Sequence, residues 1–292
     1  TIKLESVVSK GMISALEKKY DGVIEDLLQT QAFRDKAKAI ITRECDVVRS
    51  FAHKPFNVQA EKMILARGEI MSTNLVQLYH EENNIPSVLL NSLEFMFVDG
   101  DGEPVMTKIE SELKKVLQRY PDTTLFITQG FICTNDKGEV DNLKRGGSDY
   151  SASLIGAAIN ADVVEIWTDI DGIHNNDPRI VKNTHPIAEM SFDEAAELAY
   201  FGAKILHPST VLPAKVKNIP VLLKNTMEPH AKGTTISNKV TGTGIKAIAA
   251  KDGLTAIKIK SGRMLLAYGF LYRVFEIFEK YKNESAKLNG KG

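Results

Sequence analysis

The sequence predicts an α/β protein built on a mostly parallel β-sheet with helices on both faces. Short apolar segments alternate with segments of helical period through most of the chain, the pattern of a parallel sheet joined by crossover helices. A glycine pair opens a small-residue helix directly before a strand, within residues 145–168. The 292 residues are 43% hydrophobic and 25% charged, so the chain can bury a sizeable core.

The composition argues against several classes of protein. Lysine plus arginine and aspartate plus glutamate both number 37, so no global field favours nucleic acid or an anionic membrane. Cys45 and Cys133 lie far apart without metal-ligand spacing, which argues against a disulfide scaffold or zinc ribbon and for a reducing cytoplasm. No segment reaches the roughly 18 consecutive apolar residues of a membrane span, and we see no signal peptide. A charged ligand must therefore be recognised locally.

The N-terminal region is predicted to be helical. Residues 2–50 carry apolar side chains such as Met12 and Leu16 at helical spacing among lysines and glutamates. We expect a helical subdomain at residues 2–56 and a further helix at residues 57–80.

Strands begin in the next part of the chain. Apolar segments at residues 87–98 and 123–128 are expected as strands, with a helix at residues 108–120 between them. The residues after Thr128, with a turn at Lys137-Gly138, are expected to form a hairpin. This hairpin would place Arg145 at the ends of the strands.

The alternation of helices and strands continues after Arg145. The expected elements are a helix at residues 150–161, a strand at 163–167, a long helix at 192–206 and a strand at 221–223. Ser191 and Glu194 have the spacing of a capping box at the start of the long helix. Ligands of such sheets bind at the carboxyl ends of the strands, where Arg145 and Thr168 would lie.

A second, small domain is expected from about Lys246. Residues 254–260 alternate as a half-exposed strand, and residues 268–281 have the spacing of a helix. The polar tail at residues 283–292 follows without another strand, so we expect an incomplete module.

The segment Arg145-Gly-Gly-Ser-Asp149 has the features of an anion site. Glycines let backbone N–H groups approach an anion, a helix N-terminus carries unpaired donors, and an arginine can grip a carboxylate or phosphate in two places. An alternative is that Ser148 or Asp149 is an N-cap of an ordinary helix.

An acidic loop follows the strand at residues 163–167. Residues 168–179 contain three aspartates that precede Arg179, which suits phosphates. The alternative is a solvated acidic turn. The sequence contains no Walker A motif, no kinase catalytic-loop set and no G-x-G-x-x-G after a strand.

Five motifs in sequence order resemble aspartate kinase, of the amino acid kinase family. They are Gly68-Glu-Ile-Met-Ser-Thr73, Arg145-Gly-Gly-Ser-Asp149, Thr168-Asp-Ile-Asp-Gly172 with Asp177-Pro-Arg179, Glu197-Leu-Ala-Tyr-Phe-Gly-Ala-Lys-Ile-Leu-His-Pro208, and Asn225-Thr-Met-Glu-Pro229 with Gly233-Thr234. The resemblance covers about residues 57–282 and implies a three-layer α-β-α, carbamate kinase-like fold. It implies a catalytic domain at residues 1–240 and a partial ACT regulatory module, an α+β unit, at residues 246–292.

The resemblance assigns the amino-acid site. Glu69 would receive the substrate ammonium, where a solvent-facing helix glutamate is the alternative, and Arg145 would clamp the α-carboxylate. The other predicted substrate-binding residues are Phe131, Gly146 and Ser148. Asp149 is predicted to be catalytic, orienting groups around the reacting phosphoryl.

The resemblance also assigns the nucleotide site. ATP would contact Thr168, Asp169, His174, Arg179 and Lys204, the last of which is also a predicted catalytic residue. His174 stands where the family often has tyrosine, and a surface histidine is the alternative. For Lys204 the alternative is a partner of the helix dipole. The implied cofactors are ATP and Mg²⁺, and we predict no set of protein metal ligands.

The implied function is phosphorylation of the β-carboxylate of L-aspartate, the first step toward lysine, threonine and methionine. Lysine or threonine would regulate the protein through the ACT module, and a homodimer is expected. The sequence has no Lys-Phe-Gly-Gly-Thr-Ser loop, which binds the transferred phosphate in the family, so activity of this chain is an open question. A non-catalytic amino acid sensor and another amino acid kinase, such as glutamate 5-kinase, are the alternatives.

Overall fold

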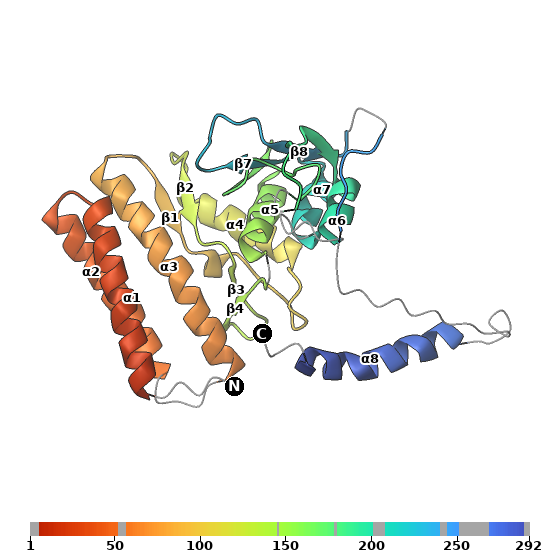
Figure 1. Ribbon diagram of the computed structural model, residues 1–292. Helices are drawn as coiled ribbons and strands as arrows, with labels where there is room; N and C mark the ends of the chain where they lie inside the picture. The colour runs from red at the N-terminus through yellow and green to blue at the C-terminus, as the bar shows by residue number, and fades with distance from the viewer. Residues whose placement is uncertain are drawn as a thin grey trace. The chain divides into compact units, whose positions relative to one another are not determined.

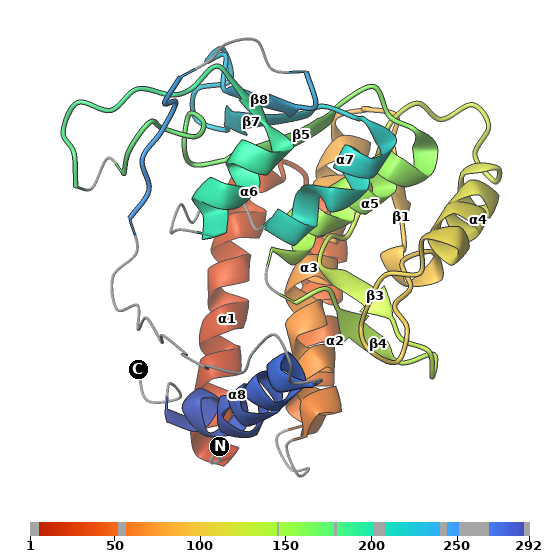
Figure 2. The same ribbon diagram turned by 90° about the vertical axis from the view of Figure 1, so that its right-hand side faces the viewer.

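The computed structural model describes residues 6–51, 57–144, 146–177, 180–200, 208–239, 244–250 and 269–288. The chain divides into two compact units, Thr1–Ala250 and Lys251–Gly292. The larger unit combines a helical bundle with strands and their covering helices (Figures 1 and 2). Within the described residues, no helix is both long and apolar enough to span a membrane.

The helical bundle consists of α1 (Ser6–Leu27), α2 (Gln31–Phe51) and α3 (Val58–Glu82), so the predicted helical region is confirmed. Buried apolar side chains from all three helices form its core, including Ile24, Ile41 and Leu75. The Glu82 carboxylate accepts hydrogen bonds from the Thr30 backbone N–H and hydroxyl, both at 2.7 Å. The end of α3 therefore caps the start of α2, where unpaired backbone donors need an acceptor.

Two parallel strands lie beside α3: β1 (Val88–Leu90) and β2 (Phe126–Thr128). Helix α4 (Met106–Leu117) connects them, close to its predicted position. The predicted strand at residues 87–98 is wrong in length, because the chain turns into a 3-10 helix, η1 (Ser92–Glu94). The side chain of Asn91 accepts a hydrogen bond from the Leu93 N–H and caps this turn.

The predicted hairpin is confirmed as β3 (Ile132–Thr134) paired antiparallel with β4 (Val140–Asn142). Its turn is closed by the Asn135 side chain, which accepts from the N–H groups of Lys137 and Glu139. Gly138 has a φ of 76°, a conformation that glycine adopts without strain.

Helix α5 (Gly147–Ile159) leads directly into β5 (Val164–Thr168). A β-carbon at Gly156 would lie 2.5 Å from the Val164 side chain, so the end of the helix packs closely on the start of the strand. The two elements are joined by a short turn and pack together, so they run in opposite directions. The first turn of α5 therefore lies at the same edge of the sheet as Thr168.

A four-stranded sheet has the order β5-β7-β8-β6, with β6 (Glu189–Ser191), β7 (Val221–Asn225) and β8 (Thr234–Ser237). The α/β class is confirmed, but the sheet is mixed: β5–β7 and β6–β8 are parallel, whereas β7–β8 is antiparallel. A β-carbon at Gly233, just before β8, would lie 1.9 Å from the Leu223 carbonyl oxygen, so only glycine fits this close approach.

Helices α5, α6 (Phe192–Tyr200) and α7 (Leu212–Lys217) pack on one face of this sheet (Figure 2). The chain also forms a 3-10 turn, η2 (Pro208–Val211). The predicted capping box is confirmed: the Glu194 N–H donates to Ser191 Oγ at 3.0 Å, and the Ser191 N–H donates to the Glu194 carboxylate at 2.7 Å. The remainder of the predicted helix, residues 201–206 with Lys204, lies outside the described residues.

The smaller unit is described as one helix, α8 (Phe270–Leu288). A helix was predicted here, but its predicted end at residue 281 is wrong. Residues 283–288 belong to the helix instead of the predicted polar tail, because they include helix formers such as Glu284, Ala286 and Lys287. The predicted strand at residues 254–260 lies outside the described residues, and the ACT module stays a prediction.

Candidate active site

A pocket of about 340 Å³ lies between α3, the segment before β3 and the first turn of α5. Its lining comprises Glu69, Phe131, Lys144, Gly146, Gly147, Ser148 and Asp149. The structure therefore brings together five of the predicted site residues from three separate parts of the chain. Arg145 stands between two lining residues in the sequence but lies outside the described residues.

The first turn of α5 forms one wall of the pocket. Its N-cap is Gly146, in the left-handed conformation with a φ of 71°, and no side chain caps the helix. The alternative that Ser148 or Asp149 acts as an N-cap is therefore wrong. The uncapped helix start directs backbone donors and the positive end of its dipole toward a ligand, which suits an anion.

The segment before β3, which contains Gly130 and Phe131, forms the second wall of the pocket and packs closely on the first turn of α5. A β-carbon at Gly147 would lie 2.5 Å from the Phe131 ring, and one at Gly130 would lie 3.1 Å from Ser148. Phe131 and Lys144 have positive φ angles, 65° and 61°. Such conformations cost energy in residues with a β-carbon, and their clustering here indicates a functional constraint on the backbone.

Two carboxylates face the pocket without a described partner. Burial raises the pKa of Glu69, and burial likewise raises the pKa of Asp149. Among the described residues, neither carboxylate forms an ion pair, and neither accepts a hydrogen bond through its side chain. A half-buried carboxylate without a partner favours a cationic ligand, because a cation would offset its desolvation.

Lys144 was not predicted as a site residue, and Gly147 was predicted only as part of the Gly-Gly segment. Lys144 precedes the Gly-Gly segment, and its position next to Arg145 was a usable signal of a cationic approach. Its side chain extends away toward Gly102, where a β-carbon would lie 3.2 Å from the Lys144 Nζ. Lys144 therefore contributes to the pocket through its backbone and the base of its side chain.

The predicted nucleotide loop starts at the end of β5. The Thr168 hydroxyl donates to the Asp169 carboxylate at 3.1 Å, and the Thr168 carbonyl accepts from the Thr226 N–H at 2.8 Å. Gly172, with a φ of 130°, passes so close to Thr234 that a β-carbon would lie 2.5 Å from its hydroxyl. These contacts hold the loop at the sheet edge where α5 begins.

His174 is held inside this loop. Its Nε2 lies 2.6 Å from an Asp171 carboxylate oxygen and its Nδ1 lies 2.8 Å from the Thr184 hydroxyl. The side chain is 16% exposed, so the alternative of an unconstrained surface histidine is wrong. Its contact with a nucleotide stays a prediction, as do those of Arg179 and Lys204, which lie outside the described residues.

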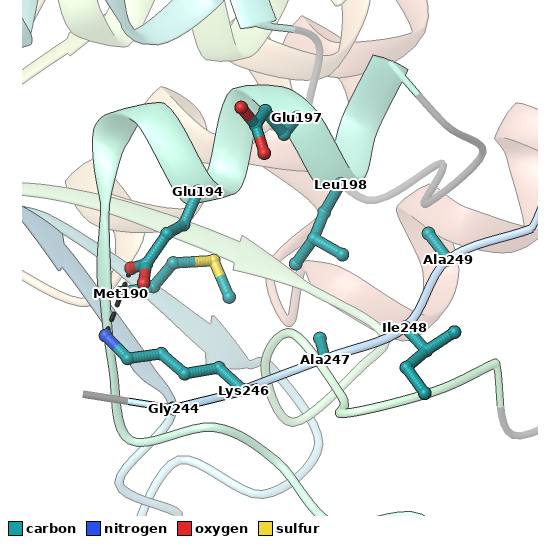
Figure 3. A pocket seen from close by; sticks show the side chains of 9 residues that line it. All are labelled: Met190, Glu194, Glu197, Leu198, Gly244, Lys246, Ala247, Ile248 and Ala249. Carbon is teal, nitrogen blue, oxygen red and sulfur yellow. Dashed lines mark hydrogen bonds and ion pairs between the residues drawn. The ribbon is translucent and has the colours of Figure 1, made fainter. Parts of the chain in front are cut away.

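Residues 244–250 form a strap against the same loop. The Ile248 N–H donates to the Asn175 carbonyl at 3.0 Å, and Lys246 Nζ pairs with the Glu194 carboxylate at 3.0 Å. Figure 3 shows this pair beside a second pocket of about 390 Å³, between α6 and the strap. Neither contact has a local signal in the sequence, since the partners lie 52 and 73 positions apart along the chain.

The described residues contain no group of three or more histidine, cysteine, aspartate or glutamate side chains that could hold a metal ion. Mg²⁺ in phosphoryl-transfer sites is commonly bound by substrate phosphates, water and one or two carboxylates. Asp149 and Asp169 lie near one edge of the sheet, so they fit the need for one or two protein carboxylates.

The comparisons with known proteins identify the family of the chain. The model of the amino acid kinase family matches residues 7–225. The lysine-sensitive aspartokinase 3 of Escherichia coli K12 is 39% identical over 224 residues, which are 75% of this chain and 49% of that enzyme. The chain thus spans about half the length of this curated relative.

The solved structures lead to the same group of enzymes. The crystal structure of E. coli aspartokinase III in complex with aspartate and ADP matches with a TM-score of 0.78 and 31% identity, over 92% of this chain and 61% of that one. The same enzyme in complex with lysine and aspartate matches with a TM-score of 0.70 and 29% identity, over 95% of this chain and 65% of that one.

Two findings define the class of protein. The fold is α/β with an uncapped helix start at a sheet edge, and the family model matches most of the chain. The chain belongs to the amino acid kinase family. Within that family it is similar to the aspartate kinases, which confirms the resemblance predicted from the five motifs.

Proposed function

We propose that the protein is an ATP-dependent aspartate kinase that phosphorylates the side-chain carboxylate of L-aspartate. One observation carries the proposal: the Glu69 carboxylate, which has no partner within the part of the chain that the structure describes, faces the uncapped start of α5 across a small pocket. One side of the pocket thus suits a cation and the other an anion, and an α-amino acid offers both. The relative crystallised with aspartate and ADP supports this substrate pair.

Each group of the substrate has a proposed partner. Glu69 receives the α-ammonium, and Arg145 clamps the α-carboxylate with its planar guanidinium. The backbone at Gly146 and the side chains of Ser148 and Phe131 close the pocket around the substrate. Two anchored groups leave the β-carboxylate free and fix its direction, so binding reduces the entropy cost of the reaction.

The nucleotide is proposed to bind at Thr168, Asp169, His174, Arg179 and Lys204. Thr168 supports this position, because it ends β5 at the sheet edge where α5 begins. When bound, Mg²⁺ would neutralise charge on the ATP phosphates. A β-carboxylate oxygen of aspartate attacks the γ-phosphorus, the bond to the β-phosphate oxygen breaks, and the products are 4-phospho-L-aspartate and ADP.

Asp149 is proposed to act beside the reacting groups. Its carboxylate lines the pocket within the first turn of α5, so it can orient the phosphoryl group or bound water. Lys204 is the proposed catalytic cation that offsets charge developing on the transferred phosphoryl group. Catalysis then depends on positioning and electrostatics, as is usual for phosphoryl transfer.

We further propose a role in the synthesis of aspartate-derived amino acids, with lysine or threonine as regulator of a homodimer through an ACT-type module. The E. coli relative in complex with lysine supports lysine as the regulator. The proposed cytoplasmic location rests on Cys45 and Cys133, which are both unpaired and buried. A non-catalytic amino acid sensor is the alternative, and measurement of the reaction product distinguishes it from the kinase.

Trapping of the acyl phosphate tests the proposal. The protein is incubated with MgATP, hydroxylamine and either L-aspartate or L-glutamate, and the hydroxamate is measured. The proposal predicts aspartyl hydroxamate and far less product from glutamate. Aspartate binding without any hydroxamate would favour the sensor, and preferred product from glutamate would favour a glutamate 5-kinase.

A further inference from the structure

The segment at residues 129–131 contacts both walls of the candidate active site. It connects β2 to β3 and lies between α3, which carries Glu69, and α5, whose first turn carries Ser148. Two buried polar side chains, Gln129 at 4% exposure and Ser151 at 2%, make the connections. Neither side chain was singled out by the motifs, and neither lines the pocket.

The first connection runs from Gln129 to α3. The Ser92 N–H donates to Gln129 Oε1 at 2.9 Å, which fixes the orientation of the amide group. Gln129 Nε2 then donates to Thr73 Oγ1 at 3.0 Å. The Thr73 hydroxyl in turn donates to the Glu69 carbonyl at 2.8 Å, so each donor and acceptor has one consistent role. The chain of hydrogen bonds ends on the residue that carries the pocket carboxylate.

The second connection runs from the same segment to α5. The Phe131 N–H donates to Ser151 Oγ at 2.9 Å, and the Ser151 hydroxyl donates to the Gly147 carbonyl at 2.9 Å. The Ser151 hydroxyl has one proton, which it donates to the helix, while its oxygen accepts the hydrogen bond from the segment at residues 129–131. It holds Phe131 in its strained conformation against the start of α5.

We infer that Gln129 and Ser151 are positioning residues that set the separation between Glu69, which receives the ammonium, and Asp149 in the first turn of α5, which lies beside the reacting side-chain carboxylate. They thereby set the length of the amino acid that the site accepts. This inference rests on the proposed function. An amino acid one methylene longer than aspartate places its side-chain carboxylate farther from its ammonium. A site with a fixed separation therefore discriminates between the two, whereas a loosened site discriminates less.

Thr73 provides the sharpest test, because two substitutions separate the hydroxyl from the shape of the side chain. Thr73→Val removes the acceptor for Gln129 and keeps the branched shape, whereas Thr73→Ser keeps the hydroxyl. We expect Thr73→Val to raise the dissociation constant of L-aspartate about tenfold, as expected for one buried hydrogen bond. ATP affinity is expected to change less than twofold, and Thr73→Ser to bind aspartate within about threefold of wild type.

Ser151→Ala tests the second connection by the same measurements, made by calorimetry on the whole protein together with its melting temperature. For both Thr73→Val and Ser151→Ala, the ratio of aspartate to glutamate affinity is expected to fall. A uniform loss of affinity for aspartate, glutamate and ATP would show a merely structural role and overturn the inference. Unchanged aspartate affinity in both variants would overturn it and leave the proposed function intact. A wild-type protein that binds no aspartate would refute the proposed function and the inference with it.

Discussion

Glu69 and Asp149 face one pocket from two different helices, and neither carboxylate has a partner among the described residues. Burial raises the pKa of both groups. A protein that served stability alone would gain by replacing such carboxylates or by pairing them. Their arrangement instead suits a ligand whose cationic group binds Glu69. Asp149 is then placed to contact a phosphoryl group or a metal ion.

Removal of the two pocket carboxylates is expected to stabilise the protein while impairing ligand binding. A carboxyl group whose folded-state pKa is raised binds more protons in the folded than in the unfolded state. Its contribution to stability is therefore greatest below the unfolded pKa and is lost as the pH rises through the folded pKa. Above the folded pKa the ionised carboxylate destabilises the folded state, so Glu69→Gln and Asp149→Asn are each expected to raise the melting temperature at pH 7 by about 1–3 °C.

Scanning calorimetry at pH 7 and pH 4 checks this prediction. The gain for Glu69→Gln should shrink at pH 4, where the wild-type carboxyl group is protonated in the folded state. A lower melting temperature for both variants at pH 7 would contradict the account, because it would show that the carboxylates have stabilising partners.

As the pH is lowered, aspartate binding is expected to weaken at a higher pH than it would if Glu69 had the usual pKa of a glutamate. Glu69 must be ionised to bind an ammonium group, and burial raises its pKa above the usual value of 4.5. Affinity should therefore fall as the pH decreases toward that raised pKa, in a range where the substrate carboxylates are still ionised. A titration of affinity against pH measures this, and the Glu69→Gln variant should lack the same transition.

Gly147→Ala is expected to reduce activity at least tenfold. The new methyl group would lie 2.5 Å from the Phe131 ring, so Phe131 or the start of α5 must move, and small displacements of reacting groups cost much of the rate. Gly22→Ala in α1 is the control, since no atom lies within 4 Å of the added β-carbon. The control should keep its activity and gain about 0.5–1 kcal/mol of helix stability. Equal kinetics for Gly147→Ala and wild type would show that the close contact is not required.

Lys246→Met is expected to raise the KM for ATP about two- to fivefold and to leave the KM for aspartate unchanged. The substitution removes the partly buried pair with Glu194, worth about 0.5–1 kcal/mol, and loosens the strap. The strap contacts Asn175 within the proposed nucleotide loop, so ATP binding should respond first. Lys232→Met, at an exposed lysine near β8, is the control. A change confined to aspartate kinetics would contradict this assignment.

Cys133 is expected to be unreactive in the folded protein. Burial raises the pKa of its thiol to about 12, and the side chain is fully buried, so almost no thiolate is present at pH 8. Cys45 is also buried, and burial raises its pKa as well. A thiol-reactive dye should label neither cysteine in native buffer and both in denaturant. Rapid labelling of Cys133 under native conditions would indicate that the hairpin opens.

The features predicted correctly from the sequence depend on short-range patterns. The Ser191–Glu194 capping box, the hairpin turn at Lys137-Gly138 and the glycine entry to α5 each involve residues within a few positions of one another. Local hydrogen bonding and backbone preference decide such structures, so the sequence alone identifies them.

The features that could not be predicted depend on contacts between distant parts of the chain. The antiparallel pairing of β7 with β8 depends on the close approach of Gly233 to Leu223. Gln129 gave no local signal, because its importance comes from being buried between Ser92 and Thr73. Long-range packing of this kind is not encoded in hydrophobic periodicity.

The most direct test of the central claim is aspartate-dependent ADP release from MgATP by the wild-type protein and by Glu69→Gln. We expect release by the wild type to require aspartate. For the variant we expect a loss of kcat/KM for aspartate of about 10- to 100-fold, because a charge-assisted hydrogen bond is removed. The KM for ATP should be unchanged. Equal aspartate kinetics for the two proteins would contradict the assignment of Glu69 as the ammonium-binding group, and with it the proposed site.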